Sequence, residues 1–236
     1  MKVAIMQPYL FPYIGYWQLI NAVDKFVILD DVNYIVRGFI NRNRILLNGQ
    51  PYMFSIPIKK ASQNKLIMDT ELYFTEEDKI KFLMTIKNAY RKAPYFHEVM
   101  PMIEKIIDNP ETDLTSYIHY SIVQINQYLG INTEILLSSK IQKDNLLKAQ
   151  NRIIEICKRL QADTYINPCG GRELYSFDKF TVNGIKLFFL VPDENMTYYQ
   201  QKEKFINKLS IIDVLMFNSK NQIFHLLERY LLEGLV

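Results

Sequence analysis

The chain has few cysteines and histidines and no excess of charge of either sign. Its 236 residues include two cysteines, which cannot form the disulfide framework of a small secreted domain. The three histidines, at positions 97, 119 and 225, are far apart and show no metal-ligand spacing. With 28 basic and 25 acidic residues, the net charge is only +3. The composition therefore gives no whole-protein argument for a metal, a nucleic acid or a membrane surface.

Long apolar runs are also missing. No stretch approaches the roughly 18 uninterrupted apolar residues of a membrane-spanning helix. The start of the chain lacks the charged segment and the small-residue cleavage site of a signal peptide. Because the sparse cysteines also fit a reducing compartment, we expect a cytoplasmic protein without a membrane partner.

Short apolar runs alternate with helical periodicity along most of the chain. Strands are expected at residues 2–6, 26–30, 134–138, 163–167 and 186–191. Helices are expected at residues 13–22, 75–92, 97–107, 113–129, 143–160, 172–180, 211–217 and 222–233. This alternation predicts parallel strands joined by right-handed crossovers. We therefore expect an α/β fold with a doubly wound, Rossmann-like parallel sheet of five strands.

One region interrupts the alternation. Residues 39–47 and 51–57 flank Asn48-Gly49, which is the strongest short signal for a β-hairpin. The hairpin and the helices after it, residues 35–130, are expected to form an insertion between the second and third core strands. The length suits one domain over residues 1–236 with this insertion included.

The turn after the first strand combines stiffness with hydrogen-bonding groups. Pro8 restricts the backbone, and Gly15 allows a close approach to the first turn of the next helix. Gln7, Tyr13 and Tyr16 supply donors and acceptors. Ligands of open α/β sheets bind beyond the carboxyl ends of the strands, which is where this turn lies. We expect these residues to form a pocket wall, although an aromatic plug of the sheet would explain the rings alone.

Two carboxylates follow the second strand at the same edge of the sheet. Asp30 and Asp31 can share a proton, bind an amine or hold Mg²⁺ through water. Capping and turn roles account for many Asp-Asp pairs, so both interpretations stay open. In the catalytic interpretation, one of the two acts as a general base.

The first hairpin strand carries alternating asparagine and arginine. Because alternate residues of a strand share a face, Asn41 and Asn43 point one way while Arg42 and Arg44 point the other. Two arginines side by side can clamp a phosphate or carboxylate. A solvent-exposed edge hairpin is the alternative. We include all four residues among the expected substrate-binding residues.

A second strand-to-helix turn contains Asn167, Gly170, Gly171 and Arg172. A cation at the start of a helix is unfavourable unless an anion lies there too, so we expect a phosphate beside Arg172. We count Arg172 with Asp30 and Asp31 as catalytic, and the other three residues of this turn as substrate-binding. A simple glycine turn is the alternative. Cys169 could act as a nucleophile, but no histidine is nearby in sequence to activate it.

The last expected site residue is Asp213, in a helix that Ser210 can cap. Asp213 is surrounded by apolar residues, and an unpaired buried carboxylate is costly. We therefore expect a partner for Asp213 and count it with the substrate-binding residues.

These motifs together resemble the WbqC-like protein family from the N-terminus to about residue 218. The resemblance rests on residues 7–16, 30–32, 41–44, 165–167, 170–175 and 209–213. Many relatives have histidine where this chain has Met6. The resemblance implies a place beside O-antigen and capsule biosynthesis in bacteria, and some family members are labelled glycine transferases.

The opening motif also resembles, more distantly, the first element of the nucleotidylyltransferase superfamily. Phe11-Pro12-Tyr13 and Gly15-Tyr16 correspond to a turn that carries two histidines in that superfamily. Here Tyr13 and Tyr16 occupy the histidine positions, and a tyrosine cannot carry a positive charge. This resemblance therefore implies the architecture and leaves nucleotidyl transfer in doubt.

Three functions are compatible with these observations. The first is a cytosolic transferase that moves an aminoacyl group, such as glycine, or an acyl group to a nucleotide-linked amino sugar. The second is a nucleotidyl-transferring or adenylate-forming enzyme, and the third is a non-catalytic protein that binds a sugar nucleotide. The expected partners are a sugar nucleotide and an activated acyl donor, with aminoacyl-tRNA as the single nucleic acid considered. No cofactor is assigned beyond a nucleotide or sugar nucleotide.

Overall fold

The structure is a computed structural model that describes residues 1–200 and 204–234. Its strands are β1 (Lys2–Met6), β2 (Lys25–Ile28), β3 (Arg42–Leu47), β4 (Gln50–Ser55), β5 (Glu134–Leu137), β6 (Thr164–Pro168), β7 (Lys186–Pro192) and β8 (Tyr230–Gly234). Its α-helices are α1 (Ile14–Asn21), α2 (Glu76–Tyr90), α3 (Phe96–Ile107), α4 (Leu114–Leu129), α5 (Ala149–Arg159), α6 (Phe177–Val182), α7 (Ile211–Phe217) and α8 (Lys220–Leu227). Three short 3₁₀ helices are η1 (Ile67–Asp69), η2 (Ser138–Lys140) and η3 (Cys169–Leu174).

The central sheet has six strands in the order β5-β2-β1-β6-β7-β8. The strands from β5 to β7 are mutually parallel, and β8 pairs antiparallel with β7. The α/β class and the largely parallel sheet are therefore confirmed, but the number of five strands is wrong. Strand β8 was expected to be the end of a helix, since its leucines continue the apolar pattern of α8.

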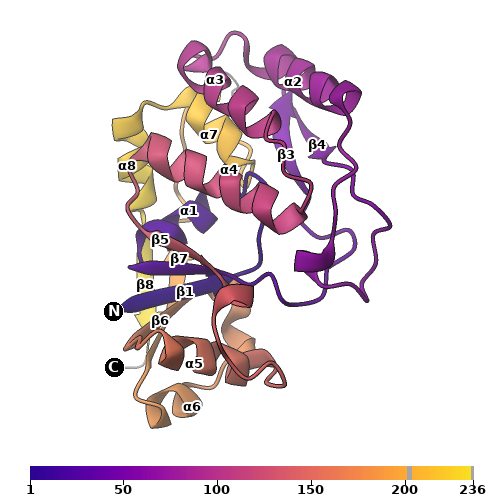
Figure 1. The fold of residues 1–236 in the computed structure, drawn as a ribbon. Coiled ribbons are helices and arrows are strands. Elements are labelled where there is room, and N and C mark those ends of the chain that lie inside the picture. Colours follow the sequence, from indigo (N-terminus) through magenta and orange to yellow (C-terminus); the bar gives the residue numbers. More distant parts are fainter. Residues whose placement is uncertain (201–203, 235–236) are drawn as a thin grey trace.

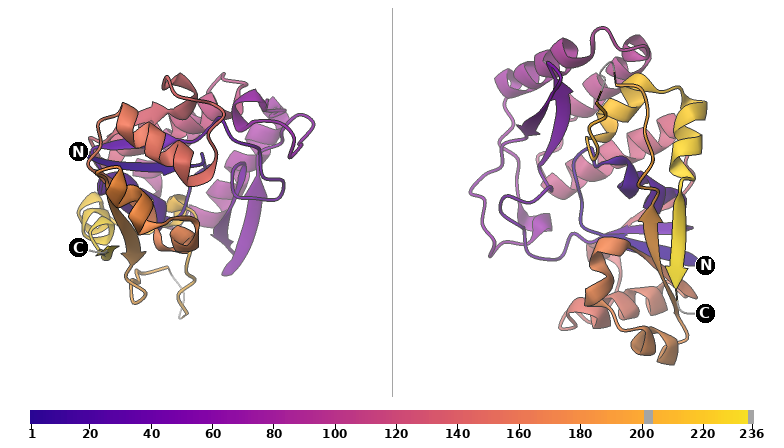
Figure 2. Two further views of the ribbon diagram at one scale, coloured as in Figure 1. Left: turned by 90° about the horizontal axis from the view of Figure 1, so that it is seen from below. Right: turned by 180° about the vertical axis from the view of Figure 1, so that it is seen from behind.

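The two faces of the sheet bury different helices (Figure 1). Alternate residues of β1 show this, because Ala4 belongs to one apolar cluster while Val3 and Ile5 belong to another. The first cluster includes side chains of α1, α4, α7 and α8, and the second includes side chains of α5 and α6. Figure 2 shows the same separation from below and from behind. The layers leave the carboxyl ends of the strands as the place where loops meet.

Between β2 and β5 the chain forms the β3–β4 hairpin and helices α2, α3 and α4. The hairpin is a separate two-stranded sheet, as expected from Asn48-Gly49. Figure 2 shows it apart from the central sheet, and the start of α7 bonds to it through the Ser210 N–H and the Arg44 carbonyl. Side chains of the hairpin and α2, among them Phe54 and Phe82, pack against Phe11 of the loop after β1. This packing joins the hairpin to the loop that follows the first strand.

Three expected helices differ from those observed. The helix expected at 143–160 begins only at Ala149, because residues 141–148 form a loop. The helix expected at 172–180 is divided into η3 and α6. The helix expected at 222–233 ends at Leu227, after which the chain enters β8. In each case the spacing of apolar residues did not locate the boundaries of the helix.

Candidate functional site

The turns after β1 and β6 meet in one pocket at the carboxyl ends of the parallel strands. The pocket has a volume of about 290 Å³, close to the lower limit for small-molecule sites. It lies where the strand order reverses, since β2 and β6 are on opposite sides of β1. Its lining residues are Tyr13, Ile14, Gly15, Pro168, Cys169, Gly170, Leu190, Val191, Pro192, Asp193, Glu194, Met196, Asn207 and Lys208.

The first wall of the pocket is the turn between β1 and α1. The ring of Tyr13 lies against Gly15, where a Cβ atom would be 2.4 Å from its Cε2. Burial raises the pKa of the Tyr13 hydroxyl above its usual value, and nearby Cys169 and Tyr9 raise it further. Tyr16 is fully buried instead, and its hydroxyl donates to the Gln7 carbonyl at 3.0 Å. Tyr13 is therefore a neutral hydroxyl at the wall, whereas Tyr16 stabilises the turn.

The β3–β4 hairpin holds this turn in place. Asn43 is buried, and its amide donates to the carbonyls of Leu10 at 3.2 Å and Phe11 at 2.8 Å. The hydroxyl of Ser210 donates to the same Phe11 carbonyl at 2.9 Å. Phe11 has φ of 44°, a conformation that L-residues rarely adopt without support. Asn43 thus satisfies two carbonyls of the loop from the hairpin side. Pro8 is buried in the same loop.

The second wall is the end of β6 and the start of η3. The amide of Asn167 lies over Gly171, where a Cβ atom would be 2.4 Å from its Nδ2. The side-chain Oδ1 of Asn167 accepts from the Tyr165 hydroxyl at 2.9 Å. Cys169 and Gly170 face the pocket, and a Cβ atom on Gly170 would meet no heavy atom within 4 Å beyond its own chain neighbours. The tight turn at Gly171 therefore directs the chain so that Cys169 and Gly170 line the pocket.

The third wall comes from residues 193–196 and 207–208, between β7 and α7, which bring charges of both signs. Asp193 forms an ion pair with Arg229, whose Nε lies 2.9 Å from the carboxylate. Glu194 and Lys208 are exposed at the pocket edge. Arg44 donates from Nη2 to the Lys208 carbonyl at 3.4 Å. The pocket is thus not uniformly positive: it offers a carboxylate and an ammonium group to one ligand.

Arg172 lies away from this pocket lining. Its guanidinium forms an ion pair with Glu233 of β8 and lies 5.1 Å from the centre of the Phe189 ring. The sequence argument required an anion beside Arg172, and the anion present is this carboxylate. The expected role of Arg172 toward a ligand phosphate stays a prediction.

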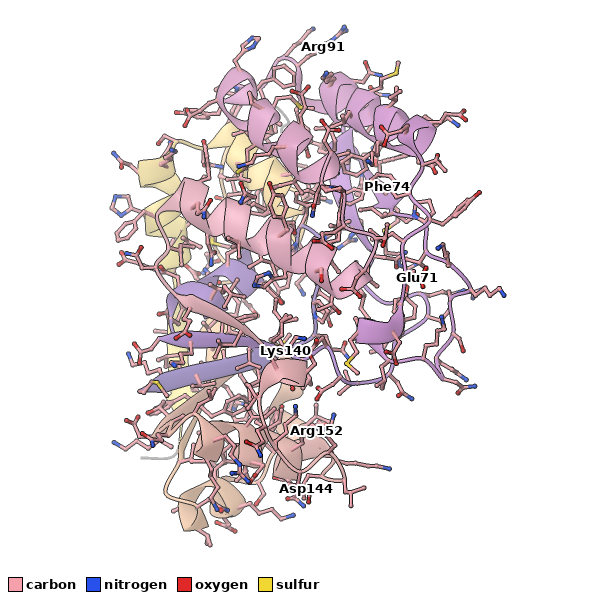
Figure 3. The ribbon with its side chains drawn as sticks, viewed as in Figure 1. Glu71, Phe74, Arg91, Lys140, Asp144 and Arg152 are labelled. Atoms are coloured by element: carbon pink, nitrogen blue, oxygen red, sulfur yellow. The ribbon has the colours of Figure 1, made fainter. Side chains whose placement is uncertain are left out.

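Asp30 and Asp31 are enclosed at the end of β2. Asp30 accepts from the backbone N–H of Ser139 at 2.9 Å and from its hydroxyl at 2.6 Å. Asp31 forms an ion pair with Lys143 at 2.7 Å, and Arg152, labelled in Figure 3, lies 3.6 Å from it. The side chain of Lys143 is 1% exposed. These carboxylates are partnered within the protein and are absent from the pocket lining, so their expected catalytic role remains a prediction.

Asp213 has the partners that the sequence could not identify. Its buried carboxylate accepts from the Tyr90 hydroxyl at 2.9 Å, the Tyr198 hydroxyl at 2.7 Å and the Gln200 amide at 2.9 Å. Burial raises the pKa of this carboxyl, and the three hydrogen bonds oppose the shift. Gln200 also bonds to the backbone of Ile206 in both directions. Asp213 therefore anchors the segment that forms the third pocket wall.

Asn41 and Arg42 lie at the start of the hairpin strand and bond to other segments. Asn41 accepts from the Tyr34 hydroxyl at 2.7 Å and donates to the Ile56 carbonyl at 2.7 Å. Arg42 donates from Nε to the Gly38 carbonyl at 2.7 Å. Neither residue lines the pocket. Of the four hairpin residues, Asn43 and Arg44 contact segments that form the pocket.

The structure adds four polar pocket residues that the sequence motifs did not indicate: Asp193, Glu194, Asn207 and Lys208. The sequence could have indicated Asp193 as a site residue by its position, because it directly follows β7 at the carboxyl edge of the sheet. Among the described residues, no cluster of His, Cys, Asp and Glu is arranged to hold a metal ion. The same residues include no helix long and apolar enough to cross a membrane.

Comparison with known proteins places the chain in a sequence family. The model of the WbqC-like protein family matches residues 7–225. The chain is 27% identical over 219 residues to the uncharacterized protein Rv1507c of Mycobacterium tuberculosis, covering 92% of this chain and 93% of that protein. No solved structure matches the chain. The resemblance drawn from the motifs is confirmed, and it brings no assigned activity with it.

Proposed function

Because the chain belongs to the WbqC-like protein family, we propose that it is a cytosolic transferase for bacterial surface polysaccharide. The proposed reaction moves an aminoacyl group, such as glycine, or another acyl group to the amine of a nucleotide-linked amino sugar. O-antigen or capsule biosynthesis is the setting that the resemblance implies. The donor is an activated acyl compound.

The observation that carries this proposal is the mixed charge of the pocket. Glu194 and Lys208 face one cavity of about 290 Å³ that also contains the neutral Tyr13 hydroxyl. A carboxylate suits an amine, and an ammonium suits a phosphate or carboxylate. An amino sugar nucleotide carries both of these groups, so the pocket's polar lining matches its two ends.

The proposed chemistry needs one bond to form and one to break. The acceptor amine attacks the acyl carbonyl carbon, and the bond from that carbon to the donor's leaving oxygen then breaks. We assign Glu194 to take the proton released by the amine and pass it to the leaving oxygen. The hydroxyl of Tyr13, kept protonated by its raised pKa, would donate to the carbonyl oxygen as negative charge develops.

We further infer that the sheet is the doubly wound core of a nucleotidylyltransferase-like fold, in which a nucleotide lies at the switch between β1 and β6. The helices on both faces and the pocket's position support this inference. Nucleotidyl transfer itself is less well supported, because burial raises the pKa values of Tyr13 and Tyr16, and neither hydroxyl can replace a histidine cation. A non-catalytic sugar-nucleotide-binding protein would use the same pocket without a donor.

The test is a thermal-shift screen of nucleotides, nucleotide-linked sugars with and without an amine, and stable aminoacyl adenylate analogues. A ligand present at a hundred times its dissociation constant adds about 2.7 kcal/mol to stability. We expect amino sugar nucleotides to stabilise the protein more than the same compounds with a hydroxyl in place of the amine. Product formation with an activated glycine donor, followed by mass spectrometry, then separates a transferase from a binding protein.

Two variants locate the ligand. Glu194→Gln should reduce the preference for amino sugar nucleotides over their hydroxyl counterparts. Lys208→Gln should weaken the binding of all phosphate-containing ligands. Lys105→Gln on α3 removes an exposed ammonium elsewhere and serves as the control. Equal stabilisation of wild type and both pocket variants by every ligand would rule out the proposed pocket.

A further inference from the structure

Residues 32–68, called here the basic arm, have an excess of positive charge that is not apparent from the net charge of +3 of the whole chain. The arm contains six basic residues and no acidic residue: Arg37, Arg42, Arg44, Lys59, Lys60 and Lys65. At the chain's average of 25 acidic residues in 236, about four would be expected in a stretch of this length. A local excess of this size attracts polyanions even when the net charge is small.

Hydrogen bonds hold the two ends of the arm together. The backbone N–H of Tyr34 donates to the Lys65 carbonyl at 2.8 Å, and Asn33 forms an isolated bridge with Leu66. Arg42 bonds to Gly38, as described above. The loop that carries Arg37 and the loop that carries Lys65 therefore lie side by side, which gathers their cations on one part of the surface.

A hollow beside these loops combines lysines with an exposed aromatic ring. It has a volume of about 460 Å³ and is lined by Ile58, Lys59, Lys60, Lys65, Glu71 and Tyr73. Tyr73 is 61% exposed. Glu71, which is labelled in Figure 3, pairs with Lys59 at 2.6 Å. One carboxylate thus faces three ammonium groups around a ring on which a nucleobase can stack.

The cations continue from the arm to the pocket. Arg42 and Arg44 lie two residues apart on β3 and share a face, which places them about 7 Å apart along the strand. Arg44 contacts the backbone of Lys208, and Lys208 lines the pocket. Arg42, Arg44 and Lys208 are therefore taken as a track of positive charge from the Gly38 loop along the hairpin to the candidate site.

We propose that the basic arm binds single-stranded RNA, with phosphates along the track and a base on Tyr73. A row of cations with an exposed aromatic ring suits a single strand of RNA. The arm also exposes Ile35, Val36, Phe39 and Met68, so binding to a lipid surface is the outcome that the test must distinguish from RNA binding. The inference deepens the proposed function and rests on it in one respect: an RNA end that reaches the pocket would carry the aminoacyl donor. RNA binding by the arm does not itself require transfer activity.

The test is fluorescence anisotropy of the full chain with a labelled single-stranded RNA of mixed sequence, about 20 nucleotides long, at several salt concentrations. We compare wild type with the triple variant Arg37→Gln/Lys60→Gln/Lys65→Gln. Each phosphate contact contributes about 0.7 to the slope of log affinity against log salt, so the triple variant should reduce this slope by about 2. The same relation predicts a loss of roughly 100-fold in affinity at 0.1 M salt.

Lys105→Gln/Lys158→Gln/Lys179→Gln removes the same charge from α3, α5 and α6 and should bind RNA like wild type. Tyr73→Ala tests stacking and should weaken binding without changing the salt slope.

Equal loss in both triple variants, or no RNA binding by wild type, would overturn the proposal. Binding to vesicles with phosphatidylserine but not to RNA would also overturn it. A small-molecule hit in the pocket without RNA binding would leave the proposed function intact, and RNA binding without such a hit would leave the arm assignment intact.

Discussion

The glycines at the two pocket turns act differently at the scale of single residues. Gly15 makes room for the Tyr13 ring, since a Cβ there would be 2.4 Å from the ring. Gly170 lies at the other wall with no heavy atom within 4 Å of an added Cβ. The first glycine therefore positions a side chain of the pocket wall, and the second leaves space beside it.

Gly15→Ala should displace the Tyr13 ring and weaken the binding of the pocket ligand that the thermal-shift screen identifies. We expect a loss of about tenfold in affinity, which corresponds to about 1.4 kcal/mol. Isothermal titration calorimetry measures it. Gly170→Ala makes the same chemical change at the opposite wall without a clash, and it should bind more tightly than Gly15→Ala. The reverse order would contradict the role given to Gly15.

Asp213 should make stability depend on pH. Burial raises its carboxyl pKa above the unfolded value near 3.8, so the folded state holds the proton more tightly. Its contribution is therefore fully present below pH 3.8 and is lost as the pH rises through the folded pKa. We expect wild type to lose stability relative to Asp213→Asn as the pH rises above about 4. Urea unfolding of both proteins between about pH 3.5 and 8 measures this difference, and a constant difference would contradict it.

At the scale of elements, the pocket depends on contacts between segments far apart in the chain. The β3–β4 hairpin supports the turn after β1, and the segment anchored by Asp213 supplies the third wall. Strand β8 closes the β7 edge and carries Glu233, the partner of Arg172. Because β8 places Glu233 beside Arg172, the anion next to Arg172 is a carboxylate of the protein.

Arg172→Ala should have little effect on stability, and its effect on the pocket ligand's thermal shift tests the expected phosphate role. Both members of the Arg172–Glu233 pair are about half exposed, and such surface pairs contribute roughly 0–1 kcal/mol. Glu233→Gln should have an equally small effect on urea unfolding. If Arg172→Ala abolished the ligand's shift while Glu233→Gln did not, Arg172 would bind the ligand phosphate, as its sequence position indicated.

At the scale of the whole molecule, a buried ion cluster joins the carboxyl ends of β2 and β5 to helix α5. Lys143 and Arg152 hold Asp31, while Asp30 holds Ser139. Buried pairs are strongly coupled to folding, because removing one partner leaves a charge without compensation. This cluster therefore fixes the loops next to the basic arm.

Asp31→Asn should destabilise the protein by about 3–5 kcal/mol, since Lys143 would remain buried and charged. Urea unfolding measures this loss. Glu155→Gln breaks the more exposed pair with Arg159 and should cost less than about 1 kcal/mol. An Asp31→Asn protein as stable as wild type but inactive in glycine transfer would favour the catalytic role expected from the sequence.

Local sequence patterns predicted much of the fold. The apolar runs located the five parallel strands, and Asn48-Gly49 marked the hairpin correctly. Strand β8 was missed because its pairing with β7 is non-local and its leucines continue the spacing of α8. The partners of Arg172 and Asp31 were missed for the same reason, since no local pattern encodes Glu233 or Lys143 as their neighbours.

The candidate site could be predicted only in part. The turns at Gly15 and Gly170 were expected at one edge of the sheet, and they do line one pocket. The third wall lies in a segment without a recognisable motif, so Glu194 and Lys208 became visible only in the structure. Asn43 bonds to the loop backbone, a partner that the alternation of residues along a strand cannot predict, and its expected role toward a substrate stays a prediction.

Alkylation of Cys169 tests the central claim, that the ligand lies between the two turns, most directly. Cys169 lines the pocket, whereas burial raises the pKa of Cys157, the chain's other cysteine, to about 12 and keeps its thiol unreactive. Iodoacetamide labelling followed by mass spectrometry should therefore modify Cys169 alone, and a stabilising amino sugar nucleotide should slow this labelling at least tenfold. A ligand that stabilises the protein while Cys169 reacts at its original rate would place the binding site elsewhere.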